Sequence, residues 1–400
     1  MKLSKLLLTT AAAALAVTGV SISAFSADRE VKIAGFGAKS GVVRSFGVNT
    51  EAVMKAAVKH INDKGGIKLG DGTMGKLTAS FDDDRCNAEE GISVLRRIAS
   101  TDAVVAVGPT CSNVAEPLFG ILQKKVDDTS DSGLQMPIFT DTAIKGGLAK
   151  ISQWAFRNVP NETVMYQTMF KWLMGKHPGI KTIYGGVEED FAHSRFTWYK
   201  VMKVRSAEAG YDVKGESKWL LNDTNFTTQV REMKKAKPDA IAISAHPFTT
   251  CGVLKEMQRQ RVKPKLLIGL TSSSSLETLN GCAKQAEGII IPTSFAPVTD
   301  DARAAAAATA EMGGSADLHS AAAWEIVLVL ADVMEKQGIM AKPDTLQADR
   351  RKIRDGLASL KSTAGLLGKI KRTEEGEATK PYLYVHAKTG EWAVLHDPSQ

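Results

Sequence analysis

The chain has 400 residues, of which 44% are hydrophobic and 24% are charged, an ordinary composition for a globular protein. Its formal net charge is +7 at pH 7, but no run of basic residues interleaved with aromatic residues occurs. We therefore expect no nucleic-acid partner, and the mild positive charge favours anionic ligands only weakly.

The N-terminus has the order of a secretory signal peptide. Lys2 and Lys5 give a basic start, residues 6–20 are apolar, and a stretch rich in small residues follows. The apolar run is shorter than the ~20 residues needed to cross a bilayer, so an uncleaved membrane anchor is the less favoured alternative. Cleavage between Ala24 and Ala27 would release an exported protein that is long enough for two or three domains.

The first part of the mature chain alternates between strand-like and helix-like segments. Apolar runs predict strands at residues 31–36, 76–81, 103–107 and 136–140, and helical spacing predicts helices at residues 49–64, 88–99 and 112–124. Strands that are joined through a helix lie parallel, so their carboxyl ends meet at one edge of the sheet. That edge is where open α/β sheets bind ligands.

A cysteine follows each of two successive strands in this block. Cys86 comes after the second strand and Cys111 after the third. In a right-handed crossover both strands end at the same sheet edge, which brings the two sulfurs within bonding distance. We therefore predict a Cys86–Cys111 disulfide, in keeping with an exported protein that has four cysteines. A Cys251–Cys282 pair is a weaker prediction, and the alternative is two buried thiols.

A second alternating block follows residues 154–157. Its predicted strands cover residues 181–187, 212–219, 240–244, 265–269 and 288–292, and its predicted helices cover residues 162–175, 191–210, 226–235 and 250–260. The last third is mainly helical, with helices at residues 300–312, 318–337 and 345–360 before a hairpin at 381–395. Two such blocks predict an α/β fold with two doubly wound, Rossmann-like lobes that share a crevice.

No pattern in the chain argues for catalysis or for a metal centre. The histidines are scattered, and no H-E-x-x-H, C-x-x-C or G-x-S-x-G motif occurs. The acidic runs at residues 82–84 and 188–190 are interpreted as solvated loops. Gly35-x-Gly37 invites a dinucleotide-binding interpretation, but the third glycine is misplaced for G-x-G-x-x-G, so we favour a flexible strand-to-helix loop. We expect no enzyme activity, no metal and no cofactor.

Several polar and aromatic residues should lie at the carboxyl ends of the predicted strands. Ser112 opens a helix, so its hydroxyl and the neighbouring N–H groups can hold an anion against the helix dipole. Each candidate alone fits a cap or a core residue better than a ligand contact, but together they come from both halves of the chain, as a cleft between two lobes requires. The candidate ligand-binding residues are Phe46, Ser112, Asn113, Asp141, Thr142, Phe191, His246 and Thr271.

Short motifs occur along the chain in a specific order and spacing. They are Ile61-Asn62-Asp63-Lys64-Gly65-Gly66-Ile67, the segments at residues 82–86 and 108–112, Phe156-Arg157-Asn158-Val159-Pro160, Asp190-Phe191-Ala192 and Lys237-Pro238-Asp239-Ala240-Ile241. In this order the chain resembles the Leu/Ile/Val-binding-protein family, the type I periplasmic solute-binding proteins of ABC transporters. The resemblance covers nearly the whole mature chain.

The resemblance implies two lobes, joined by three crossovers, that close by a hinge around a small ligand. The implied boundaries are a signal peptide at 1–27, a first lobe at 28–156 plus 292–366, and a second lobe at 157–291 plus 367–400, with crossovers near 156–158, 288–293 and 365–371. By position, Ser112 matches the family residue that holds the ligand carboxylate. Asp141 and Thr142 match contacts after the fourth strand, and Phe46, Phe191 and His246 match wall residues.

The resemblance further implies a binding protein that delivers a small carboxylate ligand to an ABC permease. The oligomeric state is open, with a monomer as the default expectation. Amino-acid binders of the family often carry an acidic residue after the strand that ends here at Gly269, but this chain has Leu270-Thr271-Ser272-Ser273. Asp141 could supply that charge, or the ligand is an aromatic or keto carboxylate or an amide. A ligand sensor of the same fold is a second hypothesis, and a secreted NAD-dependent oxidoreductase is a remote third.

Overall fold

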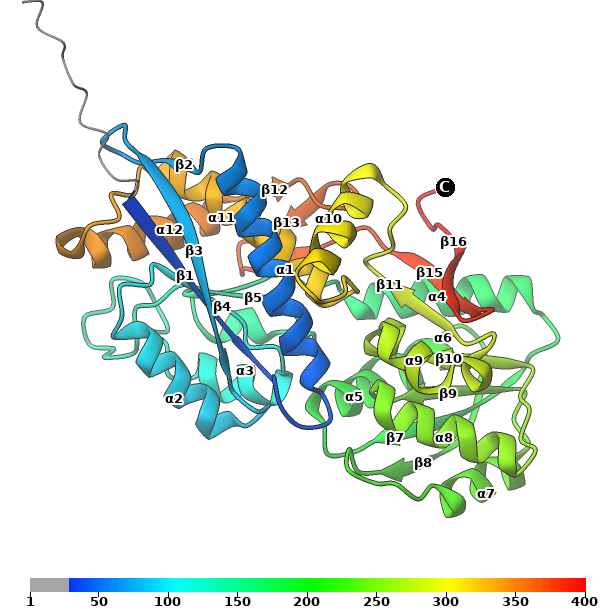
Figure 1. The fold of residues 1–400 in the computed structure, drawn as a ribbon. Helices are drawn as coiled ribbons and strands as arrows, with labels where there is room; N and C mark the ends of the chain where they lie inside the picture. The colour runs from blue at the N-terminus through cyan, green and yellow to red at the C-terminus, as the bar shows by residue number, and fades with distance from the viewer. Residues whose placement is uncertain (1–28) are drawn as a thin grey trace, which may run out of the picture.

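Two sheets, each covered by helices on both faces, organise residues 29–400, which are the residues that the computed structural model describes (Figure 1). The predicted signal peptide lies outside these residues. The first sheet has six strands in the order β2-β3-β1-β4-β5-β6, and only β2 runs antiparallel to its neighbour. Its strands are β1 (Arg29–Gly37), β2 (Ile67–Lys68), β3 (Met74–Asp83), β4 (Val105–Val107), β5 (Ile138–Thr140) and β6 (Ala155–Arg157).

The first sheet separates two hydrophobic cores because side chains alternate between the faces of a strand. In β1, Val31 and Ile33 belong to one core, whereas Ala34 and Phe36 belong to the other. Helices α1, α10, α11 and α12 cover the first of these faces, and α2 and α3 cover the second. These helices are α1 (Arg44–Asp63), α2 (Ala88–Ala99), α3 (Ser112–Phe119), α10 (Asp300–Glu311), α11 (Ser320–Gln337) and α12 (Leu346–Ser359).

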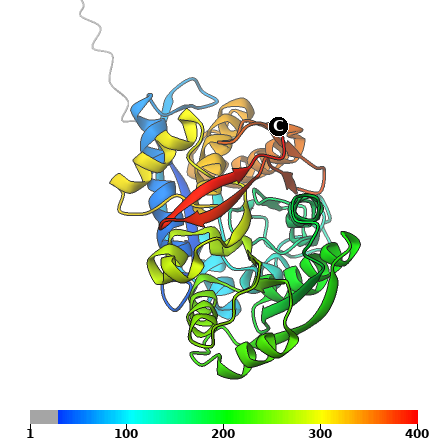
Figure 2. The same cartoon turned by 90° about the vertical axis from the view of Figure 1, so that its right-hand side faces the viewer.

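The second sheet has seven strands in the order β16-β15-β11-β10-β9-β7-β8. Its inner strands are parallel, and the terminal hairpin β15–β16 extends the sheet antiparallel to β11 (Figure 2). The strands are β7 (Thr182–Glu188), β8 (Asp212–Trp219), β9 (Ala240–Ser244), β10 (Leu266–Gly269), β11 (Ile290–Thr293), β15 (Leu383–Lys388) and β16 (Glu391–His396). Its helices are α4 (Glu162–Lys176), α5 (Ala192–Phe196), α6 (Lys203–Glu208), α7 (Thr227–Ala236), α8 (Pro247–Arg259) and α9 (Leu276–Ala286).

Helix α1 begins at Arg44 rather than at the predicted residue 49. Gly47 lies inside the helix, and a Cβ there would come within 2.3 Å of the carbonyl oxygen of Ala38. The glycine therefore permits close packing of the helix on the chain that leaves β1, and it does not end the helix. Because the helix starts early, Phe46 and Thr50 occupy successive turns of one helical face.

Gly35 and Gly37 lie within strand β1 and not in the predicted flexible loop. A Cβ on Gly35 would come within 2.5 Å of the Phe81 ring, and one on Gly37 would come within 2.2 Å of the Thr110 side chain. The two glycines are therefore explained by close packing between neighbouring strands and loops. The Gly35-x-Gly37 pattern therefore belongs to a strand and does not form a phosphate-binding loop.

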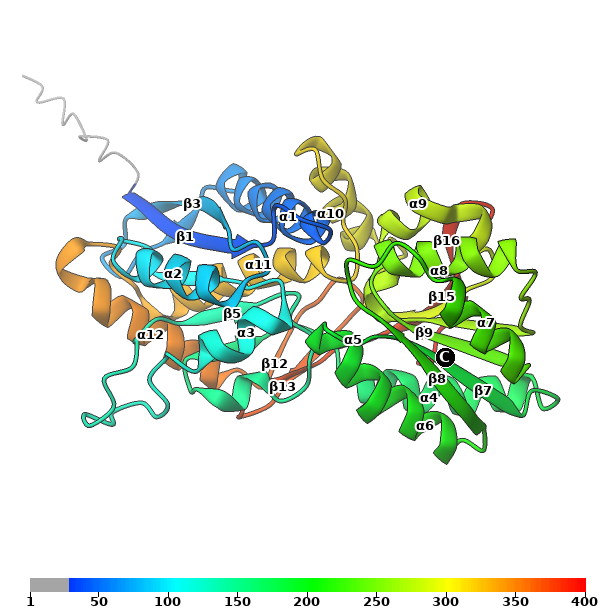
Figure 3. The same ribbon diagram turned by 90° about the horizontal axis from the view of Figure 1, so that it is seen from below.

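The chain passes between the two lobes three times (Figure 3). The crossings follow β6, β11 and α12, and the last one contains a small sheet of β12 (Ser362–Thr363), β13 (Ile370–Arg372) and β14 (Ala378–Thr379). Glu325 of α11 joins two of the crossings, because its carboxylate accepts hydrogen bonds from Asn158 Nδ2 (2.8 Å) and Leu366 N (2.8 Å) and pairs with Lys380 Nζ (2.5 Å). The two-lobe architecture is confirmed, and the exact lobe boundaries stay a prediction.

Both predicted cysteine pairs form disulfides. Cys86 and Cys111 link the end of β3 to the start of α3, with their Cα atoms 5.6 Å apart. Cys251 and Cys282 link α8 to α9, with their Cα atoms 5.4 Å apart. Each disulfide therefore fixes the position of a helix: the start of α3 next to the end of β3, and α9 next to α8.

Candidate functional site

The predicted site residues gather between the two lobes, at the carboxyl ends of the strands. Phe46 lies on α1, Asp141 and Thr142 follow β5, Phe191 and His246 follow β7 and β9, and Thr271 follows β10. All of these side chains are buried. Ser112 and Asn113 form the first turn of α3, directly after the Cys86–Cys111 disulfide.

The first turn of α3 offers backbone donors to the cleft. The N–H groups of Ser112 and Asn113 donate no hydrogen bond to any described residue, whereas those of Val114 and Ala115 donate to Cys111 O. The Ser112 hydroxyl accepts a hydrogen bond from Lys145 N at 3.2 Å. Free N–H groups at a helix N-terminus, together with the positive end of the helix dipole, stabilise a bound anion.

Asn113 joins the lobes directly. Its side-chain oxygen accepts a hydrogen bond from the backbone N–H of Ala192, which begins α5, at 2.7 Å. Two further contacts cross the cleft: Phe46 packs on His246 with ring centroids 5.8 Å apart, and Ser272 bonds to His319 at 2.9 Å. The structure therefore describes the two lobes in contact around the candidate site.

Asp141 is a buried carboxylate without a basic partner. Its Oδ2 accepts a hydrogen bond from the Thr50 hydroxyl at 2.6 Å, and its Oδ1 has no partner among the described residues. Burial raises the pKa of Asp141 to about 6, although the neighbouring hydroxyls of Thr50 and Thr142 act in the opposite direction.

An aromatic wall of the site is held in place by Glu188. The Phe191 and His246 rings pack with centroids 4.2 Å apart, and Phe46 faces His246 from the other lobe. His246 Nδ1 lies 2.5 Å from Glu188 Oε1, and Thr249 donates to Glu188 Oε2 at 2.6 Å. Burial alone would raise the pKa of Glu188, but His246 and Thr249 together hold it below its ordinary value.

Thr271 does not present a free hydroxyl to the cleft. It donates a hydrogen bond to Glu162, a buried residue that also binds Thr197 (2.6 Å) and His193 Nε2 (2.9 Å). The next residue, Ser272, bonds to His193 Nδ1 at 3.2 Å and to His319 at 2.9 Å. Thr271 therefore supports this buried hydrogen-bond network.

Two acidic runs differ from the expectation of solvated loops. Asp84 and Glu188 are both completely buried. Asp84 Oδ1 accepts a hydrogen bond from Cys86 N at 2.8 Å, and its Oδ2 has no partner among residues 29–400. Burial, helped by the charges of Asp83 and Asp141, raises the pKa of Asp84 to about 7. The sequence did not reveal these two buried residues, because each lies in a run whose other members are partly or fully exposed.

The residues that the sequence missed are Glu162, His193 and His319. They come from α4, α5 and the segment before α11, so no local spacing connects them. The one indication in the sequence was that His193 lies two residues after the predicted site residue Phe191, on the short helix α5. In the part of the chain that the structure describes, no group of His, Cys, Asp and Glu side chains could hold a metal ion.

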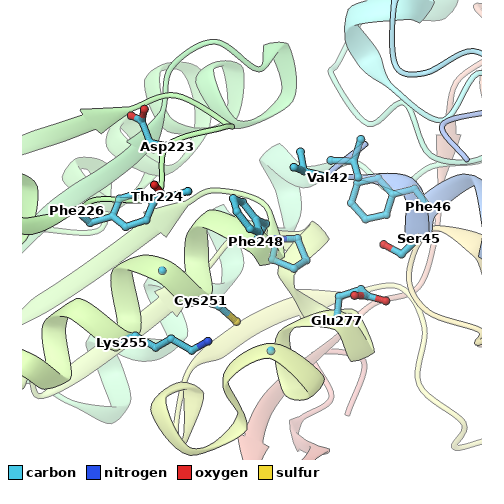
Figure 4. A pocket seen from close by; sticks show the side chains of 14 residues that line it. Val42, Ser45, Phe46, Asp223, Thr224, Phe226, Phe248, Cys251, Lys255 and Glu277 are labelled. Carbon is cyan, nitrogen blue, oxygen red and sulfur yellow. The ribbon is translucent and has the colours of Figure 1, made fainter. Parts of the chain in front are cut away.

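A cavity of about 400 Å³ opens at the mouth of the cleft, beside the outer face of Phe46. Figure 4 shows Val42, Ser45 and Phe46 on the α1 side of this cavity, with Phe248, Lys255 and Glu277 on the side of α8 and α9. Both lobes line it, so its volume depends on how far the lobes are apart. No helix within residues 29–400 is long and apolar enough to cross a membrane.

The chain matches the model of a family described as "Periplasmic binding protein" over residues 30–391. It is 32% identical over 273 residues to a Leu/Ile/Val/Thr-binding protein of Salmonella typhimurium, an alignment that covers 68% of this chain and 70% of that protein. It is 24% identical over 345 residues to the Leu/Ile/Val-binding protein BraC3 of Rhizobium johnstonii, covering 85% of this chain and 86% of the relative.

Two solved structures of similar fold contain different ligands. The branched-chain amino acid-binding protein LivJ of Streptococcus pneumoniae, in complex with isoleucine, has a TM-score of 0.76 and 17% identity, covering 92% of this chain and 100% of that chain. A solute-binding protein of R. palustris, in complex with benzoate, has a TM-score of 0.76 and 16% identity, covering 92% and 96%. At these identities the two structures support the fold and do not select a ligand.

Proposed function

The chain belongs to the periplasmic binding protein family, and from that premise we propose that it is an extracytoplasmic solute-binding protein of a branched-chain amino acid-type ABC importer. It captures a small carboxylate ligand between its lobes and delivers it to a permease in the membrane. It works as a monomer, without a cofactor and without transforming the ligand. The Leu/Ile/Val-type names of its relatives support this role.

The observation that carries the proposal is the pair of unused N–H groups on Ser112 and Asn113. They stand at the N-terminus of α3, where the Ser112 hydroxyl also lies and where Asn113 bonds to the opposite lobe. A ligand carboxylate bound there receives backbone donors and the favourable end of the helix dipole. The aromatic wall of Phe46, Phe191 and His246 then encloses the rest of a small ligand.

Capture follows from the contacts between the lobes. In the closed arrangement, Asn113 of the first lobe bonds to Ala192 of the second, and Ser272 of the second lobe bonds to His319 of the first. Phe46 of the first lobe packs on His246 of the second. A ligand that touches both lobes binds the closed form more tightly than the open form, so it shifts the population toward closure. The three crossings provide the hinge for this movement.

The proposal is tested by a thermal-shift panel on the purified exported protein, followed by calorimetry with the compounds that stabilise it. The panel contains amino acids, aromatic acids, keto acids and amides. A ligand that binds only the folded state raises the melting temperature with its concentration. We expect at least one carboxylate to do so with a 1:1 stoichiometry, and a panel with no stabilising compound would contradict the proposal.

Absence of catalysis needs its own assay, because Glu162, His193 and Ser272 form an acid–histidine–serine series. This arrangement resembles a nucleophile with its base and orienting acid. Ser272 is buried and also bonded to His319, so we propose that the series is structural. The unchanged protein and a Ser272→Ala variant should hydrolyse 4-nitrophenyl acetate at the same rate. A faster rate in the unchanged protein would contradict a purely binding role.

A further inference from the structure

A second groove lies where the two lobes meet, and it shares no lining residue with the cavity at the mouth of the cleft. Its volume is about 1010 Å³. Lys145 of the first lobe lines one side. The other side is a helical run of the second lobe, which continues from α5 through a π-helical segment (Thr197–Met202) to α6. We call this groove the basic groove, because its lining includes Lys145, Arg195, Phe196, Tyr199, Lys200 and Lys203.

The lining residues of the second lobe share one face of the helical run, because they recur at intervals of three and four residues. The residues between them, among them Trp198, Val201 and Met202, are completely buried in the core of the second lobe. On the groove face, Arg195 and Lys200 are exposed. The run therefore has one face for its own core and a second face that residues 29–400 leave largely uncovered.

Two of the four cations in the basic groove have no counter-charge. Neither Arg195 nor Lys200 forms an ion pair with a residue that the structure describes. Lys145 and Lys203 each pair with a glutamate from outside the groove lining, at 2.5 Å and 2.9 Å. Glu208, the single acid in the lining, already pairs with a neighbouring arginine at 2.6 Å. The groove therefore keeps an unbalanced positive charge.

Two other cavities that both lobes line carry no such excess. At the mouth of the cleft, Lys255 lies with Asp223 and Glu277. The cavity at the start of α4 has two basic and three acidic lining residues. The excess in the basic groove is therefore local, and the net charge of +7 of the whole chain does not explain it.

The shape and the aromatic residues of the basic groove favour a polypeptide as its partner. Tyr199 is held by a hydrogen bond to Glu189 at 3.0 Å, and its ring centroid lies 5.8 Å from Lys203 Nζ and 5.3 Å from Lys218 Nζ. Aromatic and arginine side chains are enriched where proteins recognise one another. The volume is larger than one inorganic anion needs, and a flat lipid surface does not enter a concave groove.

The basic groove is complete only while the lobes are in contact. Ala192 lines it, and the Ala192 N–H donates to Asn113 of α3 across the lobes at 2.7 Å. Lys145 N donates to the Ser112 hydroxyl at 3.2 Å. Figure 3 shows α5 at the junction of the lobes, next to α3. A ligand that favours closure therefore also favours the arrangement in which both sides of the groove are in place.

We propose that the basic groove binds an acidic polypeptide segment on the extracytoplasmic side of the permease, and that it does so with the lobes closed. This inference rests on the proposed function and adds the surface and the sign of charge that the partner recognises. The partner thereby distinguishes the loaded protein from the empty one without contacting the ligand. Since binding free energies are linked, the segment raises the ligand affinity by the same factor.

The first test is fluorescence anisotropy at low ionic strength, with a fluorescein-labelled octaglutamate peptide as the probe. We expect Arg195→Glu combined with Lys200→Glu to weaken probe binding at least about 10-fold, as the loss of two exposed charge contacts allows. Lys145→Glu should also weaken it. The control combines Arg261→Glu with Lys263→Glu, the same change of charge at two exposed residues between α8 and β10, and should bind the probe like the unchanged protein.

The second test uses membrane vesicles that contain the importer, with ATP hydrolysis as the readout and the ligand found in the panel. The Arg195→Glu and Lys200→Glu double variant should need at least about 10-fold more binding protein for half-maximal stimulation. Its ligand affinity by calorimetry should be unchanged, which also shows that it is folded. Unchanged stimulation by this variant would overturn the assignment to the permease.

The remaining outcomes separate the inference from its alternatives and from the proposed function. Equal weakening of probe binding by the control pair would overturn a specific groove, and an unaffected Lys145→Glu would overturn the contribution of both lobes. Binding to phosphatidylglycerol vesicles in preference to the probe would overturn a polypeptide partner. If no ligand is found, the proposed function fails, while the anisotropy series still decides whether the groove binds an acidic segment.

Discussion

The buried carboxylates of the cleft are of two kinds, and their partners explain the difference. Glu162 and Glu188 each bond to a histidine and to threonine hydroxyls, and their pKa values lie below the ordinary range. Asp84 and Asp141 have no histidine partner among the described residues, and burial raises their pKa values to about 7 and about 6. A buried carboxylate beside a histidine is thus kept charged, whereas one that has only one or two neutral donors is more readily protonated.

Replacing Ser112 by alanine should weaken ligand binding by roughly 1–3 kcal/mol, the usual contribution of a hydrogen bond to a charged group. The free energy of unfolding should change little, because the hydroxyl accepts only a 3.2 Å hydrogen bond from Lys145 N. Calorimetry with the ligand found in the panel measures the loss, and the exposed Ser130→Ala is the matched control. Unchanged affinity in Ser112→Ala would move the anion site elsewhere.

Asp84→Asn should change how stability depends on pH. The folded-state pKa of Asp84 is raised to about 7, so its protonated form favours folding below pH ~4 and this advantage is lost as pH rises through 7. An asparagine at this position does not ionise, so the variant avoids this loss in the free energy of unfolding, which is about 4 kcal/mol at pH 8. Urea unfolding at pH 5 and pH 8 should show the variant gaining on the unchanged protein at the higher pH.

The adjacent Asp82→Asn is the control for this measurement, since Asp82 is partly exposed and pairs with Arg97 at the surface. Its effect on the free energy of unfolding should be small at both pH values, as for most surface ion pairs. Equal pH profiles for Asp84→Asn and the unchanged protein would show that Asp84 is accessible to water in the folded state.

At the scale of elements, each disulfide fixes a helix near the candidate site. Cys86–Cys111 fixes the start of α3, where Ser112 and Asn113 lie. Cys251–Cys282 joins α9 to α8, the helix that His246 directly precedes. The sequence separations are 25 and 31 residues. Both pairs restrict the unfolded chain to a similar extent, but only the first directly precedes the proposed anion site.

Removing the second pair, with Cys251→Ser and Cys282→Ser together, should lower the free energy of unfolding by about 2–4 kcal/mol. Removing the first pair should cost a similar amount and should in addition weaken ligand binding, because α3 loses its covalent anchor. Denaturant unfolding and calorimetry on both double variants separate the two effects. Equal binding losses in the two variants would contradict a local role for Cys86–Cys111.

The sequence was a good guide to the elements and a poor guide to the polar network. Apolar periodicity predicted α2 at residues 88–99 and β8 at residues 212–219, because burial of one face or stripe leaves a local pattern. The start of α1 was wrong because Gly47 serves a tertiary contact with Ala38 that no local rule contains. Glu162, His193 and His319 meet only through the fold, so their spacing carries no trace of the contact.

At the scale of the whole molecule, the hinge is organised by one buried acid. The Glu325 carboxylate accepts hydrogen bonds from Asn158 of the first crossing and from Leu366 N and Lys380 of the third. Arg372, also of the third crossing, donates a hydrogen bond to Asn158 Oδ1 at 2.7 Å. These contacts hold two of the connections between the lobes in register.

Glu325→Gln should destabilise the protein by about 3–5 kcal/mol, since it leaves the buried Lys380 ammonium without its counter-charge. Chemical denaturation measures the loss. Glu391→Gln, an exposed change in the β15–β16 hairpin, is the control and should be nearly neutral. A loss below about 1 kcal/mol for Glu325→Gln would mean that Lys380 finds water or another acceptor when the hinge relaxes.

The bond between Cys86 and Cys111 immediately precedes the two backbone donors of α3. We therefore expect the affinity for the ligand to depend on the oxidation state of this cysteine pair. Recombinant protein that is produced in a reducing cytosol should bind its ligand less tightly than the same protein after export, and adding dithiothreitol to the exported material should reproduce the difference.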